Sequence, residues 1–232
     1  MTVYIQRHSL FKRIIHGLTA VACLTLIASG AVIFIPAVGR AVGSNVVQFV
    51  RMTHRVFAVL FIGAPLVGLI VAPKGFVHIV NNLIAPWDAD DKKFMMLFPK
   101  YLFAAKTTHM PKQHEVKSGQ RLSDGLLILA AILIAVTGVV LWAGAFVSPL
   151  VFSIALMLHD VAFVLIVIIL CAHIYLGAGI FQPYHGLIRL MFGNGRVTEA
   201  EARYHWGHWA DEEIASGKNV IVVTDTPVAE RE

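Results

Sequence analysis

The stretch PLVFSIALMLHDVAFVLIVIILCAHIYLGAGI, residues 149–180, decides the fold of this chain because Asp160 is its only charged residue. A helix needs about 20 consecutive apolar residues to cross the hydrocarbon core of a bilayer. This stretch is long enough to cross, and three further apolar stretches lie at about 14–38, 56–72 and 122–147. The sequence therefore predicts an all-α integral membrane protein, a bundle of four transmembrane helices.

The composition of the whole chain agrees with a membrane protein. Hydrophobic residues make up 57% of the 232 residues and charged residues 14%, whereas soluble domains average about 25% charged residues. We expect one four-span membrane domain over residues 1–210, with a long loop at 73–121, and a polar C-terminal tail at 211–232. The net charge of +5 does not indicate nucleic-acid binding, because the basic residues are spread along loops without a recognition motif.

Lysine and arginine residues predict the orientation of the spans. The loop at 73–121 contains Lys74, Lys92, Lys93, Lys100, Lys106, Lys112, Lys117 and Arg121, and the segment before the first span contains Arg7, Lys12 and Arg13. The connections on the other side contain Arg40, Arg51 and Arg55. Because cytoplasmic loops carry an excess of lysine and arginine, we expect both termini and the long loop to be cytoplasmic.

Four histidines, His16, His54, His159 and His173, lie within or at the ends of the spans. An ionisable residue in a span is costly and indicates a function. His173 follows His159 by 14 positions, which in a helix puts both on nearly the same face, about 21 Å apart along the axis. The order of the spans places His54 at the depth of His159 and His16 at the depth of His173. Paired imidazoles on facing helices are typical axial ligands of haem iron, so we predict two b haems.

Other interpretations of these residues stay open at this point. An intramembrane histidine can simply hydrogen-bond a neighbouring carbonyl group, and the glycines of the spans can serve helix packing as well as admit a porphyrin. Zinc would need four ligands in one place, and the two pairs lie too far apart. Neither Cys23 nor Cys171 belongs to a Cys-x-x-Cys-His motif, which excludes the usual covalent attachment of haem.

Seven further histidines lie outside the spans, and we expect most of them to be solvated. They are His8, His78, His109, His114, His185, His205 and His208.

Six short motifs are spread through most of the chain. They are FKRIIH at residues 11–16, THR at 53–55, SGQR at 118–121, HD at 159–160, HIY at 173–175 and GRVTEAEARYHW at 195–206. Together they resemble the membrane cytochrome b subunits, or gamma subunits, of respiratory formate dehydrogenases. The histidine pattern alone is shared with the cytochrome b subunits of nickel–iron hydrogenases and thiosulfate reductases. The Gly-Gln segment and the last motif favour the formate dehydrogenase type.

The resemblance implies an electron path through a complex. Electrons would leave a molybdenum- or tungsten-dependent catalytic (alpha) subunit and cross an iron–sulfur (beta) subunit to the haem held by His54 and His159. They would continue to the haem held by His16 and His173 and reduce a quinone, either menaquinone or ubiquinone. The chain would be a multi-pass protein of the bacterial inner membrane that reduces quinone but does not oxidise the primary substrate.

The resemblance also implies a quinone site, formed in the family by the second histidine of the last span and an Asn-x-Gly-Gln segment before the third span. His173, Gly119 and Gln120 match this pattern, whereas Lys117 stands at the asparagine position. Gly17 stands where a tryptophan is usual after the first histidine. We therefore expect His173, Lys117, Gly119 and Gln120 to bind quinone. The two departures from the family pattern, at Lys117 and Gly17, bear on which quinone the chain reduces or which partner complex it joins.

Two other functions fit part of the pattern. A cytochrome b subunit of a hydrogenase or another oxidoreductase complex would differ in the subunits that co-purify with it. A transporter whose histidines relay protons would need carboxylates in the middle of its spans, whereas Asp124 and Asp160 lie near span ends.

Overall fold

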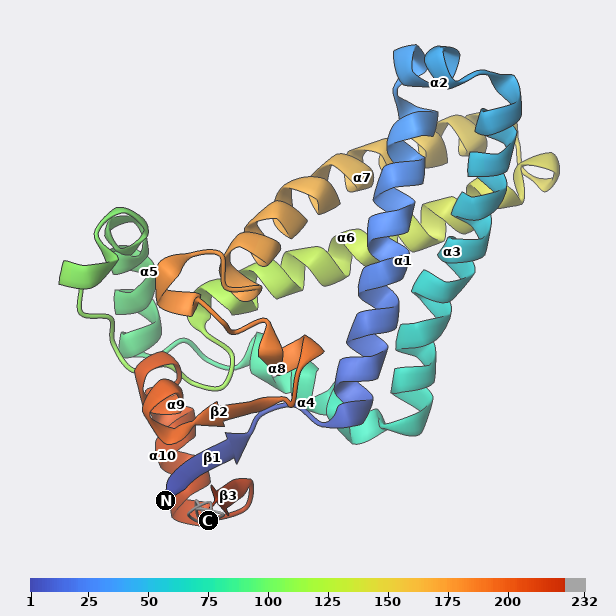
Figure 1. The fold of residues 1–232 in the computed structure, drawn as a ribbon. Helices are drawn as coiled ribbons and strands as arrows, with labels where there is room; N and C mark the ends of the chain where they lie inside the picture. The colour runs from blue at the N-terminus through green and yellow to red at the C-terminus, as the bar shows by residue number, and fades with distance from the viewer. Residues whose placement is uncertain (224–232) are drawn as a thin grey trace, which may run out of the picture.

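Four long helices dominate the computed structural model, which describes residues 1–223 (Figure 1). They are α1 Leu10–Phe34, α3 Ser44–Val71, α6 Ser118–Trp142 and α7 Pro149–Gly177. Each of them is long and apolar enough to cross a membrane. The predicted all-α membrane bundle is confirmed.

The second long helix, α3, begins well before the apolar run predicted at 56–72. It starts at Ser44 and continues through Arg51, His54 and Arg55. The two arginines interrupt the apolar pattern, but a helix is closed by backbone hydrogen bonds and tolerates charged side chains. His54 therefore lies inside a helix rather than at its beginning.

Serine caps begin two of the long helices. The side chain of Ser9 accepts a hydrogen bond from the backbone N–H of Lys12 at 3.3 Å, and that of Ser148 accepts one from Val151 at 3.3 Å. Pro149 follows Ser148 at the first helical position, where its missing N–H costs nothing. These caps set the points at which α1 and α7 enter the bundle.

The long helices are arranged as two hairpins. Helix α1 packs along α3 and α6 packs along α7, whereas contacts between the two pairs are sparse (Figure 1). Large apolar side chains point outward from both hairpins; Ile70 of α3 is 78% exposed and Leu129 of α6 is 65% exposed. An apolar surface of this extent fits a lipid environment.

Short elements connect and follow the long helices. They are α2 Pro36–Val42, α4 Pro73–Ile84, α5 Ala89–Phe103, η1 Ala105–Thr107, η2 Gly144–Phe146, η3 Gln182–Tyr184, α8 Arg189–Phe192, α9 Glu199–His205 and α10 Gly207–Ser216. Helices α4 and α5 occupy the long loop predicted at 73–121.

A small sheet joins the two ends of the described chain. Strand β1 Thr2–Gln6 lies between β2 Arg196–Thr198 and β3 Val220–Val223, antiparallel to both. Tyr4 pairs with Thr198 on one side and with Ile221 on the other. The segment predicted as a polar tail at 211–232 thus includes the end of α10 and β3, while residues 224–232 lie outside the described residues.

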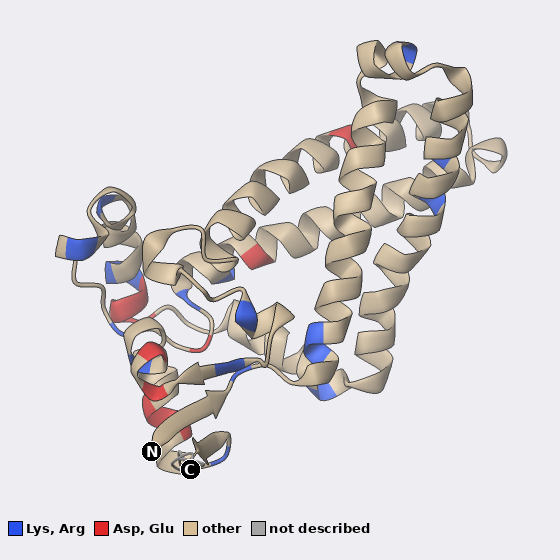
Figure 2. Ribbon diagram, in the orientation of Figure 1, with Lys and Arg blue, Asp and Glu red and all other residues tan. Residues whose placement is uncertain are grey.

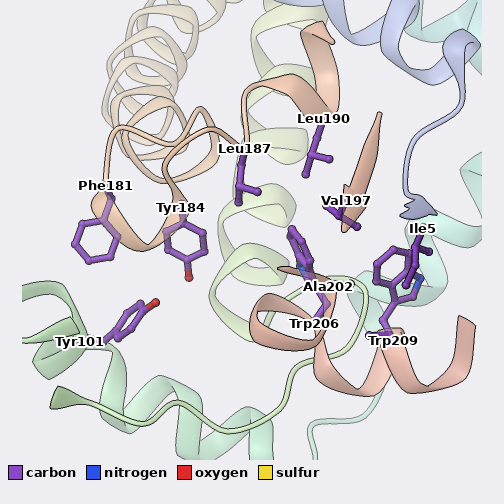
Figure 3. Packing of buried hydrophobic residues seen from close by; sticks show 11 residues of the cluster. Ile5, Tyr101, Phe181, Tyr184, Leu187, Leu190, Val197, Ala202, Trp206 and Trp209 are labelled. Carbon is purple, nitrogen blue, oxygen red and sulfur yellow. The ribbon is translucent and has the colours of Figure 1, made fainter. Parts of the chain in front are cut away.

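An apolar core lies between this sheet, α5, α9, α10 and the segment after α7 (Figure 3). It contains Ile5, Tyr101, Phe181, Tyr184, Leu187, Leu190, Val197, Ala202, Trp206, Trp209 and Ala210. Ile5 of β1 and Val197 of β2 are completely buried. We call this core and the elements around it the extramembrane domain.

A buried ion pair holds α5 against the start of α6. Arg121 Nη1 lies 3.1 Å from Asp91 Oδ2, and both side chains are almost fully buried. The Ser118 hydroxyl donates to Asp91 Oδ1 at 2.7 Å, so both carboxylate oxygens are satisfied. Breaking such a buried pair is strongly destabilising, and the pair therefore fixes where α6 begins.

Lysines and arginines gather on the extramembrane domain and at the adjoining end of α1, as Figure 2 shows. Fewer of them lie on the rest of the bundle, where Arg40 is in α2 and Arg51 and Arg55 are in α3. This distribution agrees with the predicted cytoplasmic side for the extramembrane domain, and the side itself stays a prediction.

We expect Gly195→Ala to destabilise the extramembrane domain. Gly195 has a φ of +74°, a conformation that costs an L-residue about 1–2 kcal/mol. A Cβ there would also collide with the carbonyl oxygen of His8, which follows β1. Gly217→Ala is the matched control, because Gly217 has a φ of +65° but an added Cβ meets nothing within 4 Å.

Chemical unfolding of the two variants in detergent measures the difference. Gly217→Ala should lower the free energy of unfolding by about 1 kcal/mol, and Gly195→Ala by about 2–4 kcal/mol, because the second adds a clash to the backbone strain. Equal effects of the two substitutions would contradict the close approach of Gly195 to His8.

Candidate functional site

The structure brings the four histidines of the long helices into two pairs. The ring centres of His16 and His173 are 6.4 Å apart, and those of His54 and His159 are 6.5 Å apart. In each pair one histidine belongs to the α1–α3 hairpin and the other to α7. The two pairs therefore lie where the hairpins face each other, in the pairing expected from their depths.

Hydroxyl groups set the orientation of the pair formed by His54 and His159. Ser29 Oγ lies 2.8 Å from His54 Nδ1, and it also donates to the carbonyl oxygen of Thr25 at 2.7 Å. A serine hydroxyl has one proton, so towards His54 the Ser29 oxygen acts as the acceptor. His54 then carries its proton on Nδ1, and its Nε2 keeps a free electron pair, the usual arrangement of a metal-binding histidine.

The partner histidine has the same arrangement. Thr137 Oγ1 lies 3.0 Å from His159 Nδ1 and donates to the carbonyl oxygen of Leu133 at 2.7 Å. His159 Nδ1 therefore donates to Thr137, and its Nε2 is free. Ser29 and Thr137 are 7% and 4% exposed, so water does not compete for these hydrogen bonds.

The pair formed by His16 and His173 lies close to the extramembrane domain. His16 Nδ1 is buried and has no hydrogen-bond partner among residues 1–223. The ring of His16 contacts that of Phe192, in α8, edge-on at 5.7 Å. A buried polar atom without a partner is costly, and within residues 1–223 His16 has no counterpart of the hydroxyl groups that accept from Nδ1 of His54 and His159.

The separation of the rings fits one metal ion per pair. Two imidazoles bound to one ion have ring centres about 6 Å apart, since each metal–nitrogen bond is about 2 Å and the nitrogen lies about 1 Å from its ring centre. Two imidazoles alone do not complete the coordination of a metal. A haem supplies the remaining four nitrogen ligands, so both pairs fit the axial positions of a haem iron.

Glycines keep space open beside three of the four rings. A Cβ on Gly138 would lie 3.3 Å from His159 Cε1, and one on Gly30 would lie 3.6 Å from His54 Cε1. A Cβ on Gly177 would lie 3.9 Å from His173 Cε1. A side chain at Gly138 would press against the His159 ring, whereas a Cβ on Gly30 or Gly177 would be in ordinary van der Waals contact with the neighbouring imidazole.

The expected quinone-binding residues differ in their surroundings. Lys117 is 7% exposed, and its Nζ lies 3.3 Å from His205 Nδ1 and 4.0 Å from the ring centre of Tyr184. Gln120 is exposed and donates to Asp124 at 3.1 Å. Gly119 is in the first turn of α6. The side chain of Lys117 thus lies within the extramembrane domain, whereas Gln120 is exposed.

Burial changes the protonation of this lysine and its neighbour. Burial, with the nearby charge of Arg7, lowers the pKa of Lys117 well below its usual value. Burial, with the charges of Lys117 and Arg7, lowers the pKa of His205 to about 2. His205 is therefore neutral at physiological pH, and its Nδ1 can accept a hydrogen bond from the Lys117 amine.

The solvation of the other histidines is as expected for most of them. Most of the histidines outside the spans are exposed or partly exposed, as predicted, and His8 and His205, at 9% and 8% exposed, are the two exceptions. The sheet and the core cover them, and neither element is visible in the local hydropathy.

Sequence reasoning also missed Ser29 and Thr137 as partners of the histidines. A signal was present for Ser29, which follows His16 by 13 positions. That is nearly the spacing of the two histidines in α7, so helix geometry places Ser29 at the depth of His54 and His159. A small hydroxyl residue in an apolar run is otherwise unremarkable, because it can satisfy itself on its own helix.

A comparison with curated proteins finds no match to the chain. A comparison with protein families finds the family described as prokaryotic cytochrome b561, which matches residues 7–194. The matched range contains all four long helices and both histidine pairs. A membrane cytochrome b of this kind binds haem b and transfers electrons. The chain belongs to the prokaryotic cytochrome b561 family.

Proposed function

We propose that this chain is the membrane-anchoring di-haem cytochrome b subunit of a respiratory formate dehydrogenase. It would carry electrons from an iron–sulfur subunit, itself supplied by a molybdenum or tungsten catalytic subunit, through two b haems to a quinone. The observation that carries the proposal is the pair of bis-histidine sites between the two hairpins, with ring centres 6.4 and 6.5 Å apart. Membership of the cytochrome b561 family supports haem as the group that they bind.

Each pair would hold one haem iron. His54 and His159 would bind the first haem and His16 and His173 the second, about 21 Å further along α7. The haem supplies an iron that gains and loses one electron. The chain holds His54 and His159 in the tautomer that leaves Nε2 free, through Ser29 and Thr137. Two sites at different depths would carry electrons across most of a hydrocarbon core about 30 Å thick.

The quinone would bind near the second haem, at the start of α6. Gly119, Gln120 and His173 match the family pattern, and the first turn of a helix has backbone N–H groups without intrahelical partners. Such groups, with the exposed amide of Gln120, can donate to a quinone oxygen. Lys117 belongs to this set by its position, and its amine acts through His205 and Tyr184 in holding the start of α6.

A cytochrome b subunit of a hydrogenase or another oxidoreductase complex is the second candidate, because such subunits share the histidine pattern. The subunits that co-purify with the chain from mildly solubilised membranes distinguish the two. An iron–sulfur protein with a molybdenum- or tungsten-containing subunit supports the formate dehydrogenase, whereas a nickel-containing subunit supports the hydrogenase.

We expect two haems per chain, each lost with its own histidine pair. Pyridine haemochrome quantitation should give two protohaems for the wild type and about one for His54→Ala or for His16→Ala, because one imidazole leaves the iron without an axial ligand. His185→Ala is the control, since His185 is exposed and lies outside the long helices. One haem in the wild type, or full haem in both site variants, would contradict the assignment.

The hydrogen bonds from His54 to Ser29 and from His159 to Thr137 should lower the reduction potential of the haem that this histidine pair would hold. A histidine that donates through Nδ1 is a stronger electron donor and favours the ferric state. Loss of a bond worth about 0.5–1.5 kcal/mol would raise the potential by about 20–60 mV for one electron. Redox titration of Ser29→Ala and Thr137→Val should therefore show this rise in one haem only.

Thr19→Val is the matched control for the potential. The Thr19 hydroxyl donates to the carbonyl oxygen of Ile15 in the same helix α1. Its removal should leave both potentials unchanged. A similar rise in this variant would assign the effect to the polarity of α1 rather than to the Ser29–His54 hydrogen bond.

Gln120→Ala and Lys117→Ala should have different effects. Removing the exposed Gln120 amide should raise the KM for quinone about 2–10-fold, the value of one hydrogen bond, without changing stability. Removing the buried Lys117 side chain should lower the free energy of unfolding by about 2–4 kcal/mol, because it leaves a cavity and an unpartnered His205. An increase of KM in Lys117→Ala at unchanged stability would place its amine in the quinone site instead.

A further inference from the structure

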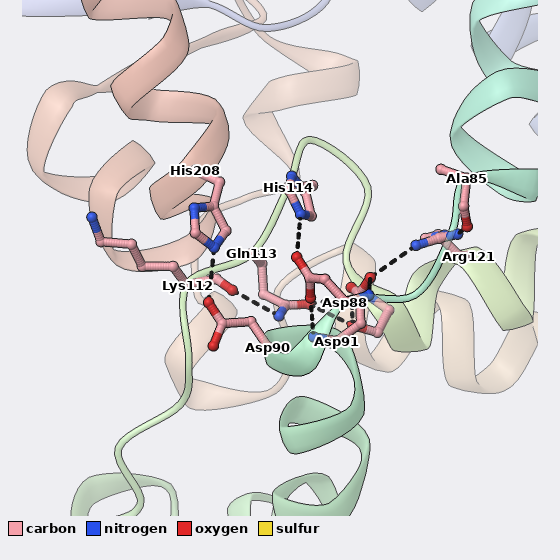
Figure 4. A network of polar contacts seen from close by, with 10 residues as sticks. Ala85, Asp88, Asp90, Asp91, Lys112, Gln113, His114, Arg121 and His208 are labelled. Atoms are coloured by element: carbon pink, nitrogen blue, oxygen red, sulfur yellow. Dashed lines mark hydrogen bonds and ion pairs between the residues drawn. The ribbon is translucent and has the colours of Figure 1, made fainter.

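Two aspartates and two histidines meet on the surface of the extramembrane domain. Asp88 and Asp90 stand at the beginning of α5, His114 lies in the loop before α6, and His208 belongs to α10 (Figure 4). His114 Nε2 is 2.9 Å from Asp88 Oδ2, and His208 Nε2 is 2.8 Å from Asp90 Oδ2. Three segments that are far apart in the sequence thus bring three metal-binding side chains together, with Asp90 as a neighbour of His208.

The two imidazoles lie against each other. The ring centres of His114 and His208 are 4.8 Å apart, and their planes differ by 23°. One ligand atom from each of Asp88, His114 and His208 lies within 4.8 Å of the other two. Small movements of these side chains would place their ligand atoms around a single ion.

The backbone around the cluster is held in place independently of any ion. Asp88 Oδ1 accepts a hydrogen bond from the backbone N–H of Asp91 at 2.7 Å, which caps α5 and leaves Oδ2 for His114. The backbone N–H of His208 donates to the carbonyl oxygen of Gln113 at 3.1 Å. The side chain of Gln113 accepts from the backbone of Ser118 at 3.0 Å, so the loop is also fixed to α6.

The cluster is open to ions from solution. The side chains of Asp88, His114 and His208 are 45%, 44% and 32% exposed. The neighbouring cation Lys112 pairs with Asp211 at 2.7 Å, and among residues 1–223 no lysine forms an ion pair with Asp88 or Asp90. Two carboxylates and two neutral imidazoles would neutralise a divalent ion.

We propose that Asp88, Asp90, His114 and His208 form a zinc site that ties α10 to α5 and to the loop before α6. Zinc favours four ligands of mixed nitrogen and oxygen type, whereas calcium and magnesium favour oxygen ligands alone. The ion would replace the two hydrogen bonds between histidine and aspartate. It would fix the C-terminal segment next to Lys117 and the start of α6, at a site separate from the haem-binding pairs.

Zinc titration of the haem-loaded, full-length protein tests this proposal. The protein is purified with an affinity tag free of histidine, treated with a chelator, and titrated with Zn²⁺ alone by equilibrium dialysis and metal analysis. We expect one Zn²⁺ per chain. X-ray absorption of the bound zinc should show two imidazole ligands and two oxygen ligands, at bond lengths of about 2.0–2.2 Å.

The double variant His114→Gln/His208→Gln should lose this binding. Loss of an outer-shell partner already weakens metal binding about 10–100-fold, so loss of two direct ligands should weaken it by more than about 100-fold. His109→Gln/His185→Gln is the matched control, because both residues are exposed histidines outside the cluster. The control should bind Zn²⁺ as the wild type does.

Two results would overturn the zinc site. One is a wild type without stoichiometric Zn²⁺ binding, which would leave two aspartate–histidine ion pairs that need no metal. The other is equal Zn²⁺ affinity in the double variant and in the control. Unchanged haem spectra show that a variant is folded, and the ligand set seen by X-ray absorption decides the question in the wild type even if a variant fails to fold.

Discussion

A polar ring inside a membrane needs a partner, and this requirement governs how the two hairpins of the chain meet. Unsatisfied polar groups are costly in lipid. Apolar contacts hold α1 to α3 and α6 to α7, but few contacts join the hairpins directly. The four imidazoles lie between them in two pairs. A haem held by each pair would supply most of the connection between the hairpins, so binding of the cofactor and assembly of the bundle would be coupled.

The long helices contribute to the site in different ways. Helix α7 carries one histidine of each pair, and α1 and α3 carry one each. Helix α6 has no histidine, but its Thr137 hydroxyl accepts the hydrogen bond from His159 Nδ1. A helix without a metal ligand can therefore still set the orientation and electron-donor strength of a ligand on its neighbour.

Hydropathy and helical periodicity are properties of neighbouring residues, which explains what could be predicted from the sequence. The long apolar runs predicted the four helices, and the 14-position spacing of His159 and His173 predicted two sites along one helix. The sheet could not be predicted in this way, because β1 pairs with β2 through residues such as Ile5 and Val197, almost the whole chain apart. The burial of Lys117 could not be predicted either, because its neighbours Tyr184 and His205 are distant in the sequence.

The extramembrane domain also contacts the pair formed by His16 and His173. Strand β1 ends at Gln6, and the backbone N–H groups of Arg7 and His8 donate to the carbonyl oxygen of Gly195 before α1 begins. The position of α1 along its own axis is therefore set by the sheet, and His16 lies within its first two turns. Phe192, from the segment after α7, contacts the His16 ring from the other side. A change in the packing of the extramembrane domain would thus shift His16 relative to His173, whereas the hydrogen-bond partners of His54 and His159 within residues 1–223, Ser29 and Thr137, belong to the long helices themselves. Of the two sites, the pair His16 and His173 is the one on which a protein bound to the extramembrane domain could act.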